Sequence, residues 1–405
     1  MISNHFKIIT SENCIINKNF FIKKHIFNDL VKYKNTFSIS YISYIKDEKS
    51  CDRLIYSMRK NKAMETTWYD LEQTNICKIT DNSITDNKEL INHNNISHNL
   101  SLSNCDNKII GYGGVYSTVF SRNSKNQQGL FSFIFSENTI SKIKLTIPEK
   151  LSIKTNYVTT FDSNVTFFKH NDLFYLYTRY NQNIGVRKTQ LFTSKEYDNN
   201  FKARGIISFN KPTVFSYMQN IFIENGIFIG IFRIYKKKNF SSHHIYNSNT
   251  KINYLLAHSF NGIDFIIDNE YFLEDINIYD IISSNHRKYD NKKSFFFSCT
   301  RGKEQNIIKE YEIRNGGYIN YKPICNSNEC KLYLKIQDDN KENILLNYII
   351  DNEGFINIFF IDKNDNILSK KEIKNKNSTN NKIKITKNSV KINIIFYKSK
   401  IYQIL

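Results

Sequence analysis

The stretch FDSNVTFFKHNDLFYLYTRY, residues 161–180, contains two apolar, aromatic-rich runs joined by a polar segment. Short runs of this kind on either side of turn-forming residues are typical of a β-hairpin. The hairpin opens on a single acid, Asp162, followed by Ser163 and Asn164. The stretch therefore predicts a strand pair and raises the question of what the Asp162 carboxylate faces.

The same hairpin pattern recurs along the chain. An apolar strand, a polar turn and a second apolar strand begin again at Arg53, Gly129, Thr189, Tyr254 and Ile307, and a further hairpin precedes each copy. Two hairpins make a four-stranded unit, and five such units predict an all-β, five-bladed β-propeller over residues 1–322. An irregular array of β-sandwiches is the alternative. The propeller is favoured because radial closure limits exposed sheet edges.

The pattern changes after Pro323. Residues 323–405 contain strands around Asn-Glu-Gly and Lys-Asn-Asp-Asn turns and end on another apolar run. This part of the sequence predicts a small C-terminal β-sandwich.

Composition narrows the classes of function. The 405 residues carry a formal charge of +19, but the lysines are spread along the whole chain and no nucleic-acid-binding signature occurs. We therefore expect no nucleic-acid partner, whereas a positive field favours anionic ligands such as acidic glycans. The seven cysteines form no CxxC pair, and neither a metal site nor a cofactor is expected. With no apparent signal peptide or membrane span, the expected location is the cytoplasm.

The first strand of each propeller blade lines a central channel, so the residues that open those strands gather at its mouth. By superposition of the hairpins, this ring contains His25, His98, Asn99, Asp162 and His286. We expect Asp162 to face an axial pocket. The alternative is that Asp162 only caps a turn through Ser163 and Asn164.

The order of the motifs resembles that of bacterial proteins similar to glycoside hydrolase family 32, within the five-bladed furanosidase group. The segments that carry the resemblance are SHNLSLSNCDNKIIGYGG, FDSN, YTRY, GVRKTQLFTSKEY and LLNYIIDNEGFINIFFIDKNDN. The resemblance implies a carbohydrate ligand at the axial pocket and a C-terminal β-sandwich. The matching positions are His98, Asn99, Asp162, Asn164, Arg179 and Arg187.

The second carboxylate that glycoside hydrolysis ordinarily requires is not identifiable. The ring position of the first unit is His25 rather than an acid, and Glu224 is expected in a turn away from the channel. Two hypotheses follow. The chain is a glycosidase in which Asp162 acts with a loop acid such as Glu65 or Glu304, or it is a degenerate propeller that binds glycans without cleaving them. A nucleic-acid-associated propeller is a third, weaker option, and the oligomeric state is open.

Overall fold

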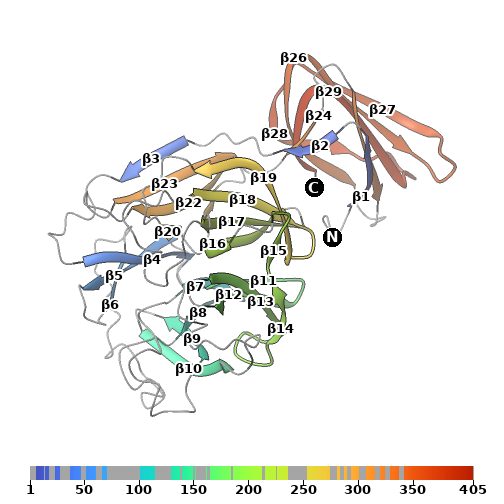
Figure 1. Cartoon of the computed structure of the whole chain (residues 1–405). Coiled ribbons are helices and arrows are strands. Elements are labelled where there is room, and N and C mark those ends of the chain that lie inside the picture. The colour runs from blue at the N-terminus through green and yellow to red at the C-terminus, as the bar shows by residue number, and fades with distance from the viewer. Residues whose placement is uncertain are drawn as a thin grey trace.

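The structure is a computed structural model, and its described residues are almost entirely β (Figure 1). The described residues are 6–12, 14–17, 23–27, 37–46, 52–60, 66–70, 101–114, 129–136, 139–148, 151, 161, 165–183, 186–211, 215–224, 226–235, 253–273, 281–282, 287–289, 293–300, 307–314, 320–323, 329–336 and 342–404. They contain no α-helix, and therefore no helix that is long and apolar enough to cross a membrane.

Five sheets built from neighbouring strands follow one another between residues 23 and 314. The first contains β4 (Phe37–Lys46), β5 (Asp52–Lys60) and β6 (Thr66–Asp70). The second contains β7 (Ser101–Cys105), β8 (Lys108–Gly114), β9 (Gly129–Ser136) and β10 (Thr139–Pro148). The third contains β11 (Thr166–His170), β12 (Leu173–Asn183), β13 (Val186–Ser194) and β14 (Lys202–Ile206).

The fourth and fifth sheets have five strands each. The fourth contains β15 (Ser208–Phe209), β16 (Phe215–Glu224), β17 (Ile227–Tyr235), β18 (Asn253–Ser259) and β19 (Asp264–Leu273). The fifth contains β20 (Ile281–Ile282), β21 (Arg287–Tyr289), β22 (Lys293–Thr300), β23 (Ile307–Arg314) and the early strand β3 (Lys23–Phe27).

One strand of each sheet takes part in a closed ring of contacts. In the described residues, β4 contacts β7, β7 contacts β11, β11 contacts β16, β16 contacts β20, and β20 contacts β4. We call these five the inner strands. The sheets are accordingly arranged around a common centre in Figure 1.

Aromatic and aliphatic side chains fill the spaces between consecutive sheets. Phe167 and Leu176 of the third sheet pack with Tyr112 of the second, and Tyr177 and Leu191 pack with residues of the fourth. Because successive side chains of a strand point to opposite faces, one strand contributes to both cores. Burial on both faces explains why these strands are apolar almost throughout.

Short polar turns set the register of the local hairpins. Asp106 and Asn107, with φ of 50° and 59°, join β7 to β8, and Asn171 and Asp172, with φ of 47° and 58°, join β11 to β12. Two consecutive residues with positive φ form the turn that matches the twist of a two-stranded ribbon, and Asn and Asp tolerate it best after glycine. The local hairpins predicted from sequence in the second and third sheets are confirmed by these pairings.

Two predicted pairings are wrong. The segment that carries His25 was expected to pair with residues 37–46, but β3 pairs with β23, at the opposite edge of the fifth sheet from β20. His25, opposite Glu310 in this register, is therefore not on an inner strand. The segment after β23 was expected to complete the same unit, but β24 (Asn320–Pro323) pairs with β2 (Cys14–Asn17) and β29 (Lys391–Ile404). The N-terminal β3 takes the place that a local hairpin would have filled.

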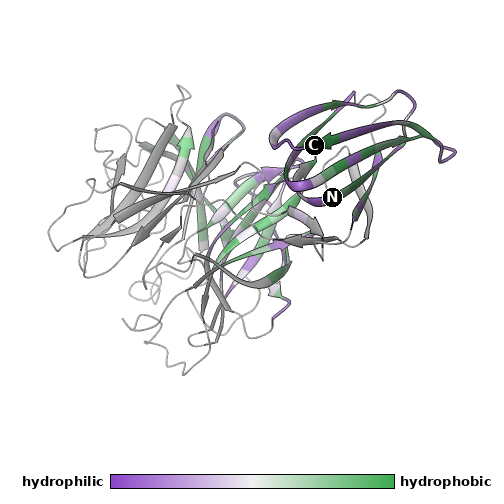
Figure 2. Cartoon of the chain, turned by 90° about the horizontal axis from the view of Figure 1, so that it is seen from above, coloured by the Kyte–Doolittle hydropathy of each residue, from purple (hydrophilic) through white to green (hydrophobic). Residues whose placement is uncertain are grey.

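The remaining strands form one sheet of eight around a separate apolar core. Besides β2, β24 and β29, it contains β1 (Phe6–Glu12), β25 (Cys330–Ile336), β26 (Asn343–Ile361), β27 (Ile367–Lys374) and β28 (Ser378–Lys384). Apolar and polar residues alternate along these strands (Figure 2). Because β1 and β2 pair here, both ends of the chain contribute to this C-terminal unit, and the division at residues 322 and 323 stays a prediction.

The two long strands of this sheet, β26 and β29, change register at a common place. Their pairing shifts between Ile350 and Phe355, where Glu353 has φ of 63° and Lys398 has φ of 41°. Glu353 and Lys398 form a 2.6 Å ion pair across this irregularity. A side chain at Gly354 would collide with the carbonyl oxygen of Lys398, so glycine permits the close approach of the two strands.

Candidate functional site

Two of the segments predicted to form the site precede the inner strands β7 and β11 in the sequence. The backbone nitrogen of Val165 donates a 3.1 Å hydrogen bond to the Oγ of Ser101, the first residue of β7. Both residues are buried. Ser101 follows His98 by three positions and Val165 follows Asp162 by three. The structure therefore joins Ser101 and Val165, the first described residues after the predicted His98, Asn99 and Asp162.

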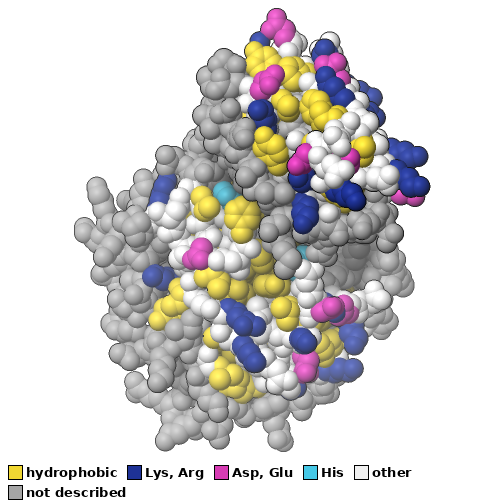
Figure 3. Space-filling view, turned by 90° about the vertical axis from the view of Figure 1, so that its right-hand side faces the viewer, with side chains coloured by type: hydrophobic (Ala, Val, Ile, Leu, Met, Phe, Trp, Pro, Cys, Tyr) yellow, Lys and Arg dark blue, Asp and Glu magenta, His cyan; other side chains and the backbone are white. Residues whose placement is uncertain are grey.

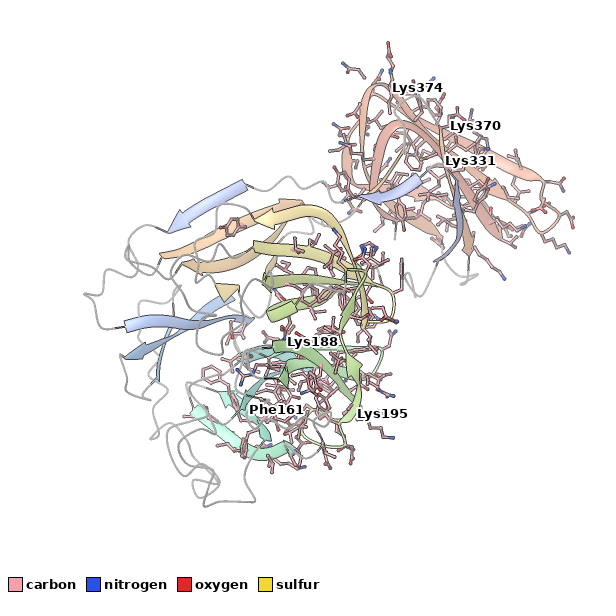
Figure 4. All side chains as sticks on the ribbon, viewed as in Figure 1. Phe161, Lys188, Lys195, Lys331, Lys370 and Lys374 are labelled. Carbon is pink, nitrogen blue, oxygen red and sulfur yellow. The ribbon has the colours of Figure 1, made fainter. Side chains whose placement is uncertain are left out.

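Phe161 fixes the other side of the Asp162 segment. Its ring is buried between the second and third sheets and lies 6.1 Å from that of Phe192, measured between centroids (Figure 4). Its carbonyl oxygen lies against Gly114, where any side chain would collide with it. Phe161 and Val165, the described residues on either side of positions 162–164, are both buried.

Hydroxyl groups connect the inner strands at two further junctions. The backbone nitrogen of Leu102 in β7 donates a 3.1 Å hydrogen bond to Ser43 Oγ in β4. Thr166 Oγ1 in β11 donates a 2.6 Å hydrogen bond to the carbonyl oxygen of Gln219 in β16. The contacts β4–β7, β7–β11 and β11–β16 therefore each contain a hydrogen bond between a side-chain hydroxyl and a backbone group. In the second contact the backbone group belongs to Val165, the residue directly before β11.

Gln219 extends this network into the third sheet. Its Oε1 accepts a 3.0 Å hydrogen bond from Thr189 Oγ1, and its Nε2 donates a 3.3 Å bond to the carbonyl oxygen of Tyr177. The hydroxyl of Tyr177 in turn donates a 3.0 Å bond to the carbonyl oxygen of Gly262. Burial raises the pKa of Tyr177 well above its ordinary value, so this phenol stays a hydrogen-bond donor. Polar groups are therefore satisfied inside an otherwise aromatic core.

Both predicted arginines lie at the end of the third sheet where β11 begins. Arg179 follows Tyr177, the register partner of Thr166, by two positions on β12. Arg187 of β13 pairs with Asn181, two positions further along. The Arg179 side chain is 5% exposed, and a buried guanidinium is stable only with polar or charged partners. The Arg187 side chain lies outside the described residues.

The other predicted residues lie outside the described part of the chain. This holds for His98, Asn99, Asp162, Asn164 and His286, and for the acids Glu65 and Glu304. Only the backbone of His25 is described, on the outer strand β3. Glu224 is the last residue of β16, and its side chain is buried rather than exposed in the turn.

Sequence reasoning missed the polar residues of β16. The Asn220 side chain is 1% exposed, and its amide nitrogen and oxygen find no hydrogen-bond partner among the described residues. Since Gln219 points toward β12 and β13, its neighbour Asn220 points to the opposite face of the sheet. The signal was the pair Gln219-Asn220 inside the apolar run of β16. Nowhere in the described residues do three or more His, Cys, Asp or Glu side chains gather as metal ligands would.

Comparisons with known proteins found similar structures only. No family model and no curated protein matches the chain. A β-fructofuranosidase of glycoside hydrolase family 32 from Bombyx mori, in complex with sucrose, is 7% identical over 90% of each chain, with a TM-score of 0.41. A family 117 glycoside hydrolase from Zobellia galactanivorans is 10% identical over 74% of this chain and 92% of its own, with a TM-score of 0.45. An endo-arabinase from Bacteroides thetaiotaomicron is 8% identical over 67% and 95%, with a TM-score of 0.43.

Proposed function

We propose that the chain is a glycoside hydrolase-like protein that acts on a poly- or oligosaccharide at the centre of a five-bladed propeller. In this proposal the five sheets are the blades, and the C-terminal unit is a β-sandwich. The hydrogen bond between Ser101 and Val165 supports the proposal, because it joins the first described residues that follow SHN and FDSN in the sequence. A sugar at the start of β7 and β11 would meet polar groups from both segments.

Asp162 is the proposed catalytic or transition-state-stabilising carboxylate. The described residues on either side of its segment, Phe161 and Val165, are both buried. A carboxylate on a segment anchored in this way has few positions to sample, and that restriction favours catalysis over a freely moving loop acid. In the transition state of glycoside hydrolysis, positive charge develops at the anomeric carbon, and a fixed carboxylate stabilises it.

The remaining residues have proposed roles in binding. His98, Asn99 and Asn164 supply hydrogen-bonding groups for sugar hydroxyls, and His286 would approach from the fifth sheet. Arg179 and Arg187 present planar forks that suit a carboxylate, either that of Asp162 or that of an acidic sugar. His25 is left out of this set because β3 is an outer strand.

Hydrolysis requires a second carboxylate across the channel. A separation of about 5–5.5 Å between the carboxyl groups would give retention of configuration, and about 6.5–9.5 Å would give inversion. Glu65 or Glu304 is the proposed partner. The alternative function is a glycan-binding propeller that keeps the pocket without this second acid.

The test is a screen of the purified full chain against neutral and acidic polysaccharides for release of reducing ends, with Asp162→Asn and Asp172→Asn compared to the wild type. The two variants lose the same charge, but Asp172 is an exposed residue of the β11–β12 turn with φ of 58°, which asparagine tolerates. We expect Asp162→Asn to lose at least about 100-fold of any activity and Asp172→Asn to keep it.

The two functions separate in the same experiment. If no polysaccharide is cleaved but one binds, and Asp162→Asn weakens that binding, the glycan-binding alternative holds. Equal activity of Asp162→Asn and the wild type would contradict the proposed role of Asp162 in either form.

A further inference from the structure

The C-terminal unit has an outward sheet face on which aromatic rings lie half-exposed. On β26, the even-numbered residues Ile356, Ile358 and Phe360 are buried in the core, whereas Phe355 and Phe359 point outward and are half-buried. The alternation of the strand places Tyr333 of β25 and Tyr397 of β29 on the same outward face. Four aromatic residues thus share a surface built from three neighbouring strands.

Amide side chains lie between these rings. Asn393 pairs with both Tyr333 and Phe359 in the register, so it lies between them in one row across the sheet. Asn357 lies one row along, opposite Ile395. The Asn357 Oδ1 atom is buried and has no hydrogen-bond partner among the described residues, so it is not itself open to a ligand. Rings beside amides are the two components with which proteins bind sugars, through stacking and through hydrogen bonds to hydroxyls.

Lysines lie on the first and last of the strands that form the face, and Figure 3 shows basic and acidic side chains side by side on the C-terminal unit. Lys331 and Lys335 are on β25, and Lys370 and Lys374 are on β27. On β26, Phe359 pairs with Lys370 of β27, and Phe355 pairs with Lys374. Each of these two rings therefore has a lysine opposite it on the neighbouring strand. Lys370 Nζ also lies 5.7 Å from the centroid of the Phe359 ring. We call this surface the lysine-edged face.

The charge on the face is positive. Glu372 lies within it and forms a 3.0 Å ion pair with Lys374, and Glu12 of β1 is the register partner of Lys331. The four lysines outnumber these two acids. The lysine rows on β25 and β27 are three strand spacings apart, about 14 Å. A ligand that spans the face would therefore be several sugar units long, with anionic groups over the lysines and ring faces over the aromatics.

We propose that the lysine-edged face binds an acidic polysaccharide, as a second glycan site separate from the inner strands. The composition favours a glycan over a nucleic acid, because residues 329–404 contain no arginine, the residue best suited to phosphate. Two apolar side chains at the start of β27, Ile367 and Leu368, are 62% and 39% exposed, so an anionic membrane is the competing ligand that the test includes. The site does not depend on the proposed activity of Asp162.

Affinity electrophoresis of the full chain tests the proposal, with dextran sulfate as the acidic probe and neutral dextran as its reference. The double variant Lys335→Glu, Lys370→Glu reverses one exposed lysine at each edge of the face. The matched control, Lys195→Glu with Lys202→Glu, reverses two exposed lysines, one directly after β13 and one on β14. We expect dextran sulfate to retard the wild type, the face variant to bind at least about 10-fold more weakly, and the control to change by less than about 2-fold.

A second comparison separates a glycan site from simple ion exchange. Tyr333→Ser should weaken binding of dextran sulfate several-fold but leave binding of polyglutamate, which has charge without sugar rings, unchanged. Three results would overturn the proposal. The face variant and the control could lose binding equally, or Tyr333→Ser could affect both polymers equally. The third result is tighter binding of single-stranded DNA or of anionic vesicles than of dextran sulfate.

Discussion

Thr166 and Gln219 join two inner strands through a 2.6 Å hydrogen bond from the threonine hydroxyl to the glutamine carbonyl oxygen. Both residues are buried. The bond lies one position after Val165, whose nitrogen binds Ser101 on the other side of the same strand. The start of β11 is thus connected to β7 and to β16 at adjacent residues.

Replacing Thr166 by valine should destabilise the fold. The shape of the side chain is nearly kept, but a buried carbonyl oxygen loses a donor, and we expect a loss of about 1–2 kcal/mol in the free energy of unfolding. Urea denaturation would measure it. The control is Thr139→Val, whose hydroxyl bonds the Ser136 carbonyl within one partly exposed hairpin and should matter less. Equal losses in the two variants would contradict a special role of the junction.

Replacing Gly114 by alanine should displace the backbone before Asp162. The added methyl group would collide with the carbonyl oxygen of Phe161, and backbone atoms move less easily than the end of a side chain. We expect a loss of about 1–3 kcal/mol in stability. The same substitution should lower any Asp162-dependent activity of the protein that remains folded. An unchanged midpoint of urea denaturation would contradict the expected loss of stability.

Removing the hydroxyl of Tyr177 should weaken the contact between the third and fourth sheets. Tyr177→Phe leaves the buried carbonyl oxygen of Gly262 without its donor, at a cost of about 1–2 kcal/mol. Tyr175→Phe is the matched control, since Tyr175 is half-buried on the same strand and stacks on Phe168 with 5.4 Å between ring centroids. Thermal unfolding should show a lower midpoint for Tyr177→Phe and a smaller change for the control.

Cys105 should resist alkylation in the folded protein. Burial, together with the neighbouring Asp106 carboxylate, raises the pKa of this thiol from 9.0 to about 11. The folded thiol therefore stays mostly protonated up to pH 10, whereas the unfolded thiol is half ionised at pH 9 and largely ionised at pH 10. Because the unfolded chain then binds fewer protons, this stabilising contribution is complete below pH 9 and is lost as the pH rises toward 11.

Iodoacetamide at pH 9, followed by peptide mass spectrometry, measures this protection. Cys105 should be modified in urea and remain unmodified without it. A Cys105→Ala variant should lose part of the fall in stability between pH 9 and 11. Rapid modification of Cys105 in the folded chain would contradict its burial.

The sequence predicts local pairings well and distant ones poorly. Turns such as Asn171-Asp172 fix the β11–β12 hairpin by themselves, so residues 161–180 are sufficient to predict it. The pairing of β3 with β23 depends on which sheet lacks an edge strand once the other strands have paired. No residue near His25 indicates which sheet that is. The same reason explains why β24 was assigned to the wrong sheet.

For the site, the sequence predicts positions but not the contacts that the described strands make around them. Arg179 was predicted from a motif, and the structure places it at the end of the sheet where β11 begins. The hydroxyl bonds of Ser43, Ser101 and Thr166 were not predictable, because a serine or threonine in a strand gives no sign of which distant backbone group it will meet.

The position of β1, β2 and β3 has a consequence for biosynthesis. These strands leave the ribosome first, yet their partners β23, β24 and β25 are among the last to be made. At about 5–20 residues per second, the nascent chain must keep three strands without partners for roughly 15–60 s. The fifth sheet and the C-terminal unit are therefore both completed late in synthesis. A chain released before that point has unpaired strand edges in both places.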